Sequence, residues 1–141
     1  MKVSTRAKYG VKAMVDLAIN SKNEKCISLK SIATRQNIPE NYLEQLMSTL
    51  KKAEIVSSIR GVQGGYILNK APEHISVADL IKVLEGNLAI VDCVENSEAV
   101  LKCGTGTCSK CRARDAWEII SDKFVEAASS ISLADLIKDN K

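Results

Sequence analysis

The sequence predicts a mainly α-helical fold that carries one small β-hairpin and, toward its C-terminus, a long helix. Aromatic residues make up only 4% of the 141 residues, and seven glycines and two prolines are few for a many-stranded β-fold. Apolar residues recur at helical spacing in several segments. A turn with three glycines, residues 61–65, separates two short strand-like runs. A content of 45% hydrophobic and 26% charged residues is typical of one globular domain.

Three helices are predicted in the first 52 residues. The first begins near Ala7 behind a cap at Ser4 or Thr5. The second is capped by Ser28 and ends near residues 37–39, because the residue before a proline disfavours the helical conformation. The third has Pro39 in its first turn and an apolar stripe within residues 43–50. The second and third helices together form a helix-turn-helix candidate.

A strand at residues 55–60 and a returning strand at 66–68 follow, with Arg60 at the tip of the hairpin. A hairpin directly after a helix-turn-helix predicts a winged helix-turn-helix. Residues 76–79 begin a fourth helix with a capping-box pattern, and Gly86 ends it. Residues 87–110 show no sustained period and are a candidate functional segment. A long helix is then predicted from about residue 111 to 130, with Trp117 and Phe124 on its apolar side, and Ser132 caps a short terminal helix.

The charge distribution points to a polyanion as the partner of the first half. Residues 1–70 contain 12 Lys/Arg and 5 Asp/Glu, whereas residues 71–141 contain 8 and 12. Cations in this half that could contact phosphates are Lys2, Arg6, Lys8, Lys12, Lys51 and Lys52. The alternative is that these charges only solvate the surface.

The outward face of the third helix carries side chains that can distinguish bases. Asn41 and Gln45 can pair with adenine, and Glu44 can accept a hydrogen bond from cytosine N4. Arg60 could enter a minor groove. The glycines of the tip, Gly61, Gly64 and Gly65, belong to the same predicted DNA-binding set, although turn chemistry alone also explains them. The sequence therefore predicts binding to double-stranded DNA.

Four of the five cysteines fall within residues 93–111, with the spacing C-x9-C-x4-C-x2-C. Thiolates suit iron–sulfur clusters and zinc, and redox-active thiols are a third interpretation. Cys26 is interpreted as structural or incidental, and His74 as a surface or packing residue.

Several classes of protein are disfavoured. No run of 18 apolar residues predicts a membrane span, and the N-terminus does not resemble a signal peptide, so we expect a cytoplasmic protein with reduced cysteines. The sequence has no Ser/His/Asp order, no phosphate-binding loop and no carboxylate pair with a clear role. We therefore do not expect an enzyme.

Three strings in order, Met1-Lys2-Val3-Ser4-Thr5, Tyr42-Leu43-Glu44-Gln45-Leu46 and Arg60-Gly61-Val62-Gln63-Gly64-Gly65-Tyr66, resemble the IscR/NsrR/CymR family of bacterial transcription regulators. The resemblance covers nearly the whole chain. It implies a homodimeric repressor or dual regulator with Tyr42, Glu44 and Arg60 on the DNA face. It also implies three units: a DNA-binding domain at 1–86, a cluster-binding loop at 87–110, and a dimerisation helix with a short terminal helix at 111–141.

By resemblance to the cluster-binding branch, Cys93 matches the first ligand and Cys111 the last. The familiar spacing puts the middle ligand at Thr105, so Cys103 or Cys108 must replace it. The fourth-ligand positions of IscR-like and NsrR-like members fall at Arg114 and Lys8, neither of which binds iron. We therefore expect Cys93, Cys103, Cys108 and Cys111 to hold a [2Fe–2S] or [4Fe–4S] cluster. Zinc, a thiol-redox site and control by a partner protein, as in CymR-like members, stay as alternatives.

Overall fold

The computed structural model describes residues 2–91, 94 and 111–138. Its elements in chain order are α1 (Thr5–Asn20), α2 (Leu29–Gln36), α3 (Glu40–Lys52), β1 (Val56–Ile59), β2 (Gly65–Leu68), the 3-10 turn η1 (Pro72–His74), α4 (Val77–Glu85), α7 (Arg112–Ser130) and α8 (Leu133–Leu136). The predicted fold class, mainly α with one hairpin, is confirmed. None of the helices in these described ranges is long and apolar enough to cross a membrane.

Serine side chains cap the N-terminal ends of four of the helices. Ser4 and Ser28 accept hydrogen bonds from the backbone N–H groups of Ala7 and Ser31. Ser76 and Ser132 each form a complete capping box with an aspartate three residues later. The helix starts predicted from these serines are therefore confirmed. The prediction for Pro39 was wrong by one position, because Pro39 has an extended ψ of 130° and precedes α3 rather than entering its first turn.

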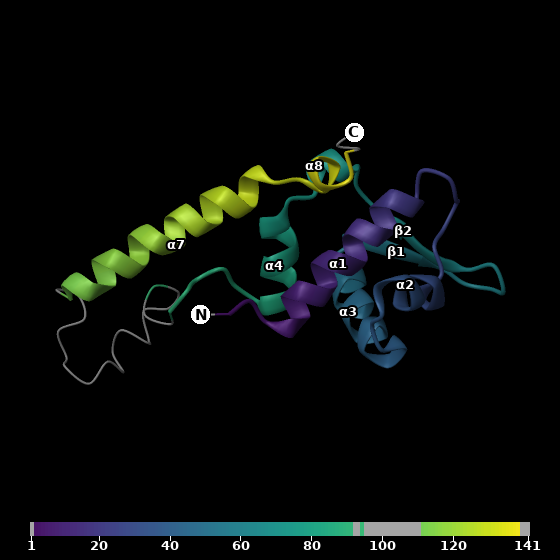
Figure 1. The fold of residues 1–141 in the computed structure, drawn as a ribbon, viewed down its shortest axis with the longest axis horizontal. Helices are drawn as coiled ribbons and strands as arrows, with labels where there is room; N and C mark the ends of the chain where they lie inside the picture. Colours follow the sequence, from purple (N-terminus) through teal and green to yellow (C-terminus); the bar gives the residue numbers. More distant parts are fainter. Residues whose placement is uncertain (1, 92–93, 95–110, 139–141) are drawn as a thin grey trace.

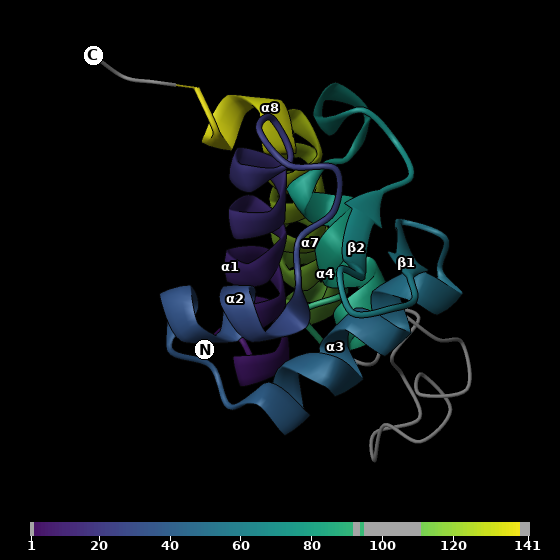
Figure 2. The same cartoon turned by 90° about the vertical axis from the view of Figure 1, so that its right-hand side faces the viewer.

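The core lies where α1, α2, α3 and α4 meet the hairpin (Figures 1 and 2). Leu43, Leu46, Met47 and Leu50 are fully buried, so the predicted stripe of α3 is its inward face. The strands β1 and β2 pair antiparallel, with Val56 opposite Leu68 and Ile59 opposite Gly65. This packing leaves the opposite face of α3 in solvent.

The C-terminal residues return to this same core. The backbone N–H of Val77 donates to Ile131 O, and that of Leu133 donates to Ile75 O, both at 2.8 Å. Leu133 is fully buried among residues of the first four helices. The C-terminal end of the connection between α4 and α8 is thereby fixed beside the start of α4.

Ahead of this anchored end, α7 (Arg112–Ser130) projects away from α1, α2 and α3, and its N-terminal end lies farthest from them (Figure 1). Its packing face is narrow, with Ser121 and Ala128 as its buried residues. Large apolar side chains on the rest of the helix stay exposed, namely Trp117, Ile119, Ile120 and Phe124. Trp117, Ile120 and Phe124 recur at helical spacing, and an exposed apolar stripe of this kind on a single chain marks an interaction surface.

Candidate nucleic-acid interface and cysteine segment

The outward face of α3 forms one wall of a shallow groove with a volume of about 710 Å³, which we call the α3 groove. Its lining residues are Arg6, Asn41, Glu44, Gln45, Ser48, Thr49 and Lys52. Asn41, Glu44 and Gln45 are exposed because the opposite face of the helix, with Leu43, Leu46, Met47 and Leu50, is buried in the core. The structure thus brings the predicted base-reading side chains together on one surface, which the cations Arg6 and Lys52 also line.

Arg6 is the one lining residue that comes from α1. Its Nε donates a hydrogen bond of 3.1 Å to the carbonyl oxygen of Leu84, in the last turn of α4. Within the described residues no carboxylate forms an ion pair with Arg6. The guanidinium therefore keeps its charge for the groove while one of its five N–H donors is used in the fold.

Tyr42 is half-buried rather than fully turned to solvent. Its ring makes an edge-to-face contact with Tyr9 of α1, with centroids 6.0 Å apart. The ammonium of Lys8 lies 5.9 Å from the centre of the Tyr9 ring. Tyr42 therefore helps to fix α3 against α1 at the edge of the predicted DNA face.

The hairpin tip carries Arg60, which is exposed directly after β1. Gly61 has a φ of +120°, and the Gly64 N–H donates to Gly61 O at 3.0 Å to close the turn. A Cβ on Gly64 would overlap the carbonyl oxygen of Ile59. Two of the three predicted DNA-contacting glycines are thus required by the turn itself.

The wing is held against the loop that precedes α2. Ile27 and Tyr66 exchange two backbone hydrogen bonds, Ile27 N–H to Tyr66 O at 3.0 Å and Tyr66 N–H to Ile27 O at 2.7 Å. The Cys26 thiol donates to Gln63 O at 3.1 Å. Gly65 makes this approach possible, since a Cβ there would overlap backbone atoms of Ile27 and Ser28. The position of the wing is therefore set by the helix-turn-helix.

Tyr66 also connects the wing to α3 through charge. Burial of its ring raises the pKa of the Tyr66 phenol, and the nearby Glu44 carboxylate raises it further. Glu44 of α3 and Tyr66 of β2 therefore interact electrostatically. Sequence patterns gave no indication of this pair, because the two residues lie on different elements.

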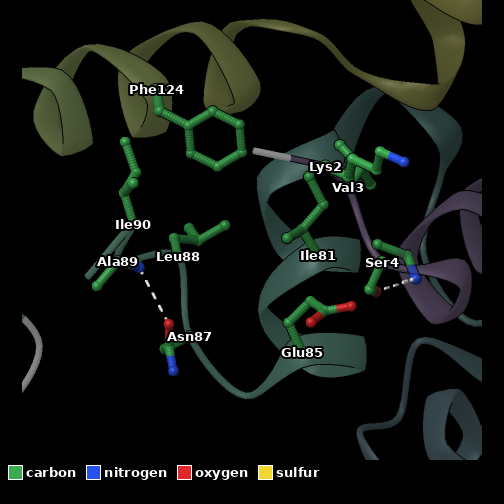
Figure 3. A pocket seen from close by; sticks show the side chains of 11 residues that line it. Lys2, Val3, Ser4, Ile81, Glu85, Asn87, Leu88, Ala89, Ile90 and Phe124 are labelled. Atoms are coloured by element: carbon green, nitrogen blue, oxygen red, sulfur yellow. Dashed lines mark hydrogen bonds between the residues drawn. The ribbon is translucent and has the colours of Figure 1, made fainter. Parts of the chain in front are cut away.

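Two of the predicted phosphate-binding lysines lie elsewhere. The Lys12 ammonium donates to Gln36 O at 2.9 Å, where it caps the C-terminal end of α2. Lys2 lines a separate cavity of about 460 Å³ between α4 and α7. Figure 3 shows Phe124 of α7 facing this cavity, with Ile81 of α4 and Leu88 and Ile90 around it. Neither lysine is part of the α3 groove.

Of the four predicted cluster ligands, Cys111 is described and the others, Cys93, Cys103 and Cys108, lie outside the described residues. Cys111 is the N-cap residue of α7, and its free, half-exposed thiol forms no side-chain capping bond. Cysteine sulfur is a common ligand of zinc and of iron–sulfur clusters. Cys111 thus fits the role of a metal ligand. The described ranges contain no group of three His, Cys, Asp or Glu side chains that could hold a metal ion.

Comparison with known proteins agrees with this arrangement. The Rrf2 family, described as "Iron-dependent Transcriptional regulator", matches residues 3–139. The HTH-type transcriptional regulator CymR of Bacillus subtilis (strain 168) is 40% identical over 136 residues, which cover 96% of this chain and 89% of CymR.

Solved structures give the same result. The structure of T. potens IscR matches with a TM-score of 0.78 and 42% identity, over 100% of this chain and 89% of that one. The structure of CymR, the global cysteine regulator of B. subtilis, matches with a TM-score of 0.76 and 38% identity, over 97% of this chain and 96% of that one. These relatives are transcriptional regulators and not enzymes. With its winged helix and exposed α3 groove, the chain therefore belongs to the Rrf2 family of bacterial transcriptional regulators, which bind DNA and typically dimerise.

Proposed function

We propose that this chain is a homodimeric repressor or dual regulator that binds double-stranded operator DNA through the α3 groove and the wing. The observation that carries the proposal is the composition of that groove. It joins hydrogen-bonding side chains on one exposed helix face with the cations Arg6 and Lys52. DNA recognition needs both, because phosphate contacts position the protein and base contacts specify the sequence.

Each part of this surface has a role in the proposal. Asn41 and Gln45 form hydrogen bonds with adenine. Glu44 accepts a hydrogen bond from cytosine N4 and repels base edges that present hydrogen-bond acceptors. Arg6 and Lys52 contact phosphates, and Arg60 enters the adjacent minor groove. Gly64 and Gly65 act indirectly, since they hold the wing in its position.

We propose further that an iron–sulfur cluster held by Cys93, Cys103, Cys108 and Cys111 controls the affinity for the operator. Cys111 supports this, because a free thiol at the N-terminus of α7 suits a metal ligand. The description of the family as iron-dependent and the 42% identity with T. potens IscR also support it. When bound, the cluster would supply a redox- and iron-sensitive group. The chain would respond through α7, which follows its N-cap residue Cys111 directly and would set the spacing of two winged helices in a dimer.

The first test is anaerobic purification, a visible absorption spectrum, and analysis of iron, sulfide and zinc in the same sample. We expect a brown protein with equal iron and sulfide. Cys108→Ala should lose the stable cluster, whereas Cys26→Ala should keep it. A Cys108→Ala protein with a full, stable cluster would contradict the all-cysteine site, and one zinc per chain in a colourless protein would identify a structural zinc site instead.

The second test measures switching. The protein selects duplexes from a random-sequence pool, and the affinity for the selected duplex is compared between the cluster-loaded and metal-free dimers at one salt concentration. We expect different affinities. Equal affinities for every selected duplex would show that the cysteine site does not control DNA binding.

The 40% identity with CymR of B. subtilis favours one other candidate, a regulator without a metal that responds to a partner protein or to thiol oxidation. A colourless, metal-free protein that reconstitution cannot load would support it.

A further inference from the structure

Arg6 belongs to two structural units at once. Its side chain lines the α3 groove, and its Nε donates to Leu84 O, 78 residues away in sequence. The remaining N–H donors of the guanidinium are available for an anion in the groove. One side chain thus touches both the surface proposed to bind DNA and the end of α4.

The bond to Leu84 has a specific role in the fold. The last four carbonyls of a helix lack partners inside that helix. In α4, the Gly86 N–H satisfies Lys82 O at 2.8 Å, and Arg6 satisfies Leu84 O. A cation is also favourable at the negative end of the helix dipole. Arg6 is therefore a side-chain cap for α4, supplied by α1.

The packing of Gly10, one turn after Arg6 in α1, holds Leu84 in place beside this hydrogen bond. Gly10 faces Leu84 so closely that a Cβ on Gly10 would overlap a methyl group of Leu84. Leu84 itself is only 3% exposed. Its side chain is held by Gly10 and its carbonyl by Arg6, so a displacement of the end of α4 must change the position of the guanidinium.

The end of α4 leads directly to α7. After Gly86, the Ile90 N–H donates to the buried Ser121 hydroxyl of α7 at 3.4 Å. Leu88 and Ile90 share the cavity with Phe124 (Figure 3). We call residues 84–91 with Ser121 and Phe124 the α4–α7 junction.

We propose that Arg6 is a positioning residue whose guanidinium is shared between Leu84 O and a DNA phosphate, so that DNA binding and the arrangement of the α4–α7 junction are linked. This inference rests on the proposed DNA binding, but it does not require the cluster. By reciprocity, any event that displaces the junction changes the affinity for DNA, and DNA changes the junction.

The test uses the metal-free full chain and a duplex that the wild-type protein selects from a random pool. Hydrogen exchange of the amides of residues 84–91 is measured with and without this duplex. We expect DNA to change these exchange rates severalfold in the wild type. Arg6→Lys keeps the positive charge, so it should weaken DNA binding less than Arg6→Gln does. The single ammonium of a lysine should not, however, contact Leu84 O and a DNA phosphate at the same time. Both variants should lose the DNA-dependent change.

Lys52→Gln is the matched control, because Lys52 lines the same groove from α3. This variant should bind DNA more weakly, and the slope of log affinity against log salt concentration should fall by about the amount expected for one phosphate contact. It should keep the DNA-dependent change in hydrogen exchange at residues 84–91. The inference fails if Arg6→Lys and Arg6→Gln keep the wild-type change, or if a wild type that binds DNA shows no change at the junction. Failure of the proposed function looks different, since the wild type would then select no duplex.

Discussion

Asp16 of α1 lies with its carboxylate against the guanidinium of Arg35 of α2, with Nη2 2.8 Å from Oδ1 and Nε 3.0 Å from Oδ2. The Asp16 side chain is 3% exposed, and amides of Gln36 and Asn20 complete its partners. Hydrogen bonding to Asp16 raises the pKa of Arg35. This cluster fixes the angle between α1 and the helix-turn-helix.

Replacing Arg35 should therefore destabilise the fold. Arg35→Ala leaves a buried carboxylate with only amide partners, and we expect a loss of about 2 kcal/mol in the free energy of unfolding. The loss stays below that of a fully buried pair because Arg35 is 40% exposed. Urea denaturation measures it, with exposed Lys30→Ala on the same helix as the control. Equal stability of the two variants would mean that the ion pair does not support the fold.

Gly65→Ala should release the wing. The new Cβ overlaps backbone atoms of Ile27 and Ser28, which cannot move as a flexible side chain would. We expect a loss of about 1–3 kcal/mol in stability and weaker DNA binding. Urea denaturation and DNA titration measure these effects. Val62→Ala, at a fully exposed position of the same hairpin, should change neither stability nor the Ile27–Tyr66 pairing.

Glu44→Gln should lower the pKa of Tyr66. The value should stay above the ordinary 10.0, because burial is the larger of the two causes. A raised pKa in the folded state means that stability is complete below pH 10 and falls as the pH rises through the folded-state value. In the Glu44→Gln variant this fall should begin at the same pH, be smaller, and end at a lower pH. Carbon-13 titration of the tyrosine ring carbons measures the pKa, and Glu40→Gln is the control; an unchanged Tyr66 would place Glu44 away from the wing.

Ile120→Asp should weaken the dimer. Ile120 is 45% exposed on the single chain, in the apolar surface of α7. Burying an unpaired carboxylate at such an interface costs at least about 2 kcal/mol, or roughly a 30-fold rise in the dimer dissociation constant. Sedimentation at several protein concentrations measures it. Glu126→Ala, an exposed position of the same helix, should sediment like the wild type; a dimeric Ile120→Asp protein would place the interface elsewhere.

Local patterns were sufficient to predict most of the fold. Apolar spacing identified the buried stripe of α3, and serines at helix starts identified the caps, because both signals lie within one turn of chain. Asp16 was different. In the sequence it only interrupts an apolar run, and its partner Arg35 becomes visible once α1 and α2 cross.

The same distinction applies to the candidate site. The outward residues of α3 follow from helical periodicity, so Asn41, Glu44 and Gln45 could be placed together. The double role of Arg6 and the position of Lys2 beside α7 depend on contacts between distant elements. The four-cysteine ligand set stays a prediction, since only Cys111 belongs to the described residues.

Under the proposed pairing of two chains, the projecting α7 has a consequence for the abundance of this regulator in the cell. An unpaired chain presents Trp117, Ile119, Ile120 and Phe124 to solvent, and such surfaces are recognised by chaperones and proteases. Pairing of two chains depends on their concentration by mass action. At low rates of synthesis, degradation would remove single chains before they meet. The amount of dimeric regulator would then rise more steeply than its rate of synthesis. Below a threshold rate of synthesis, little dimer would accumulate.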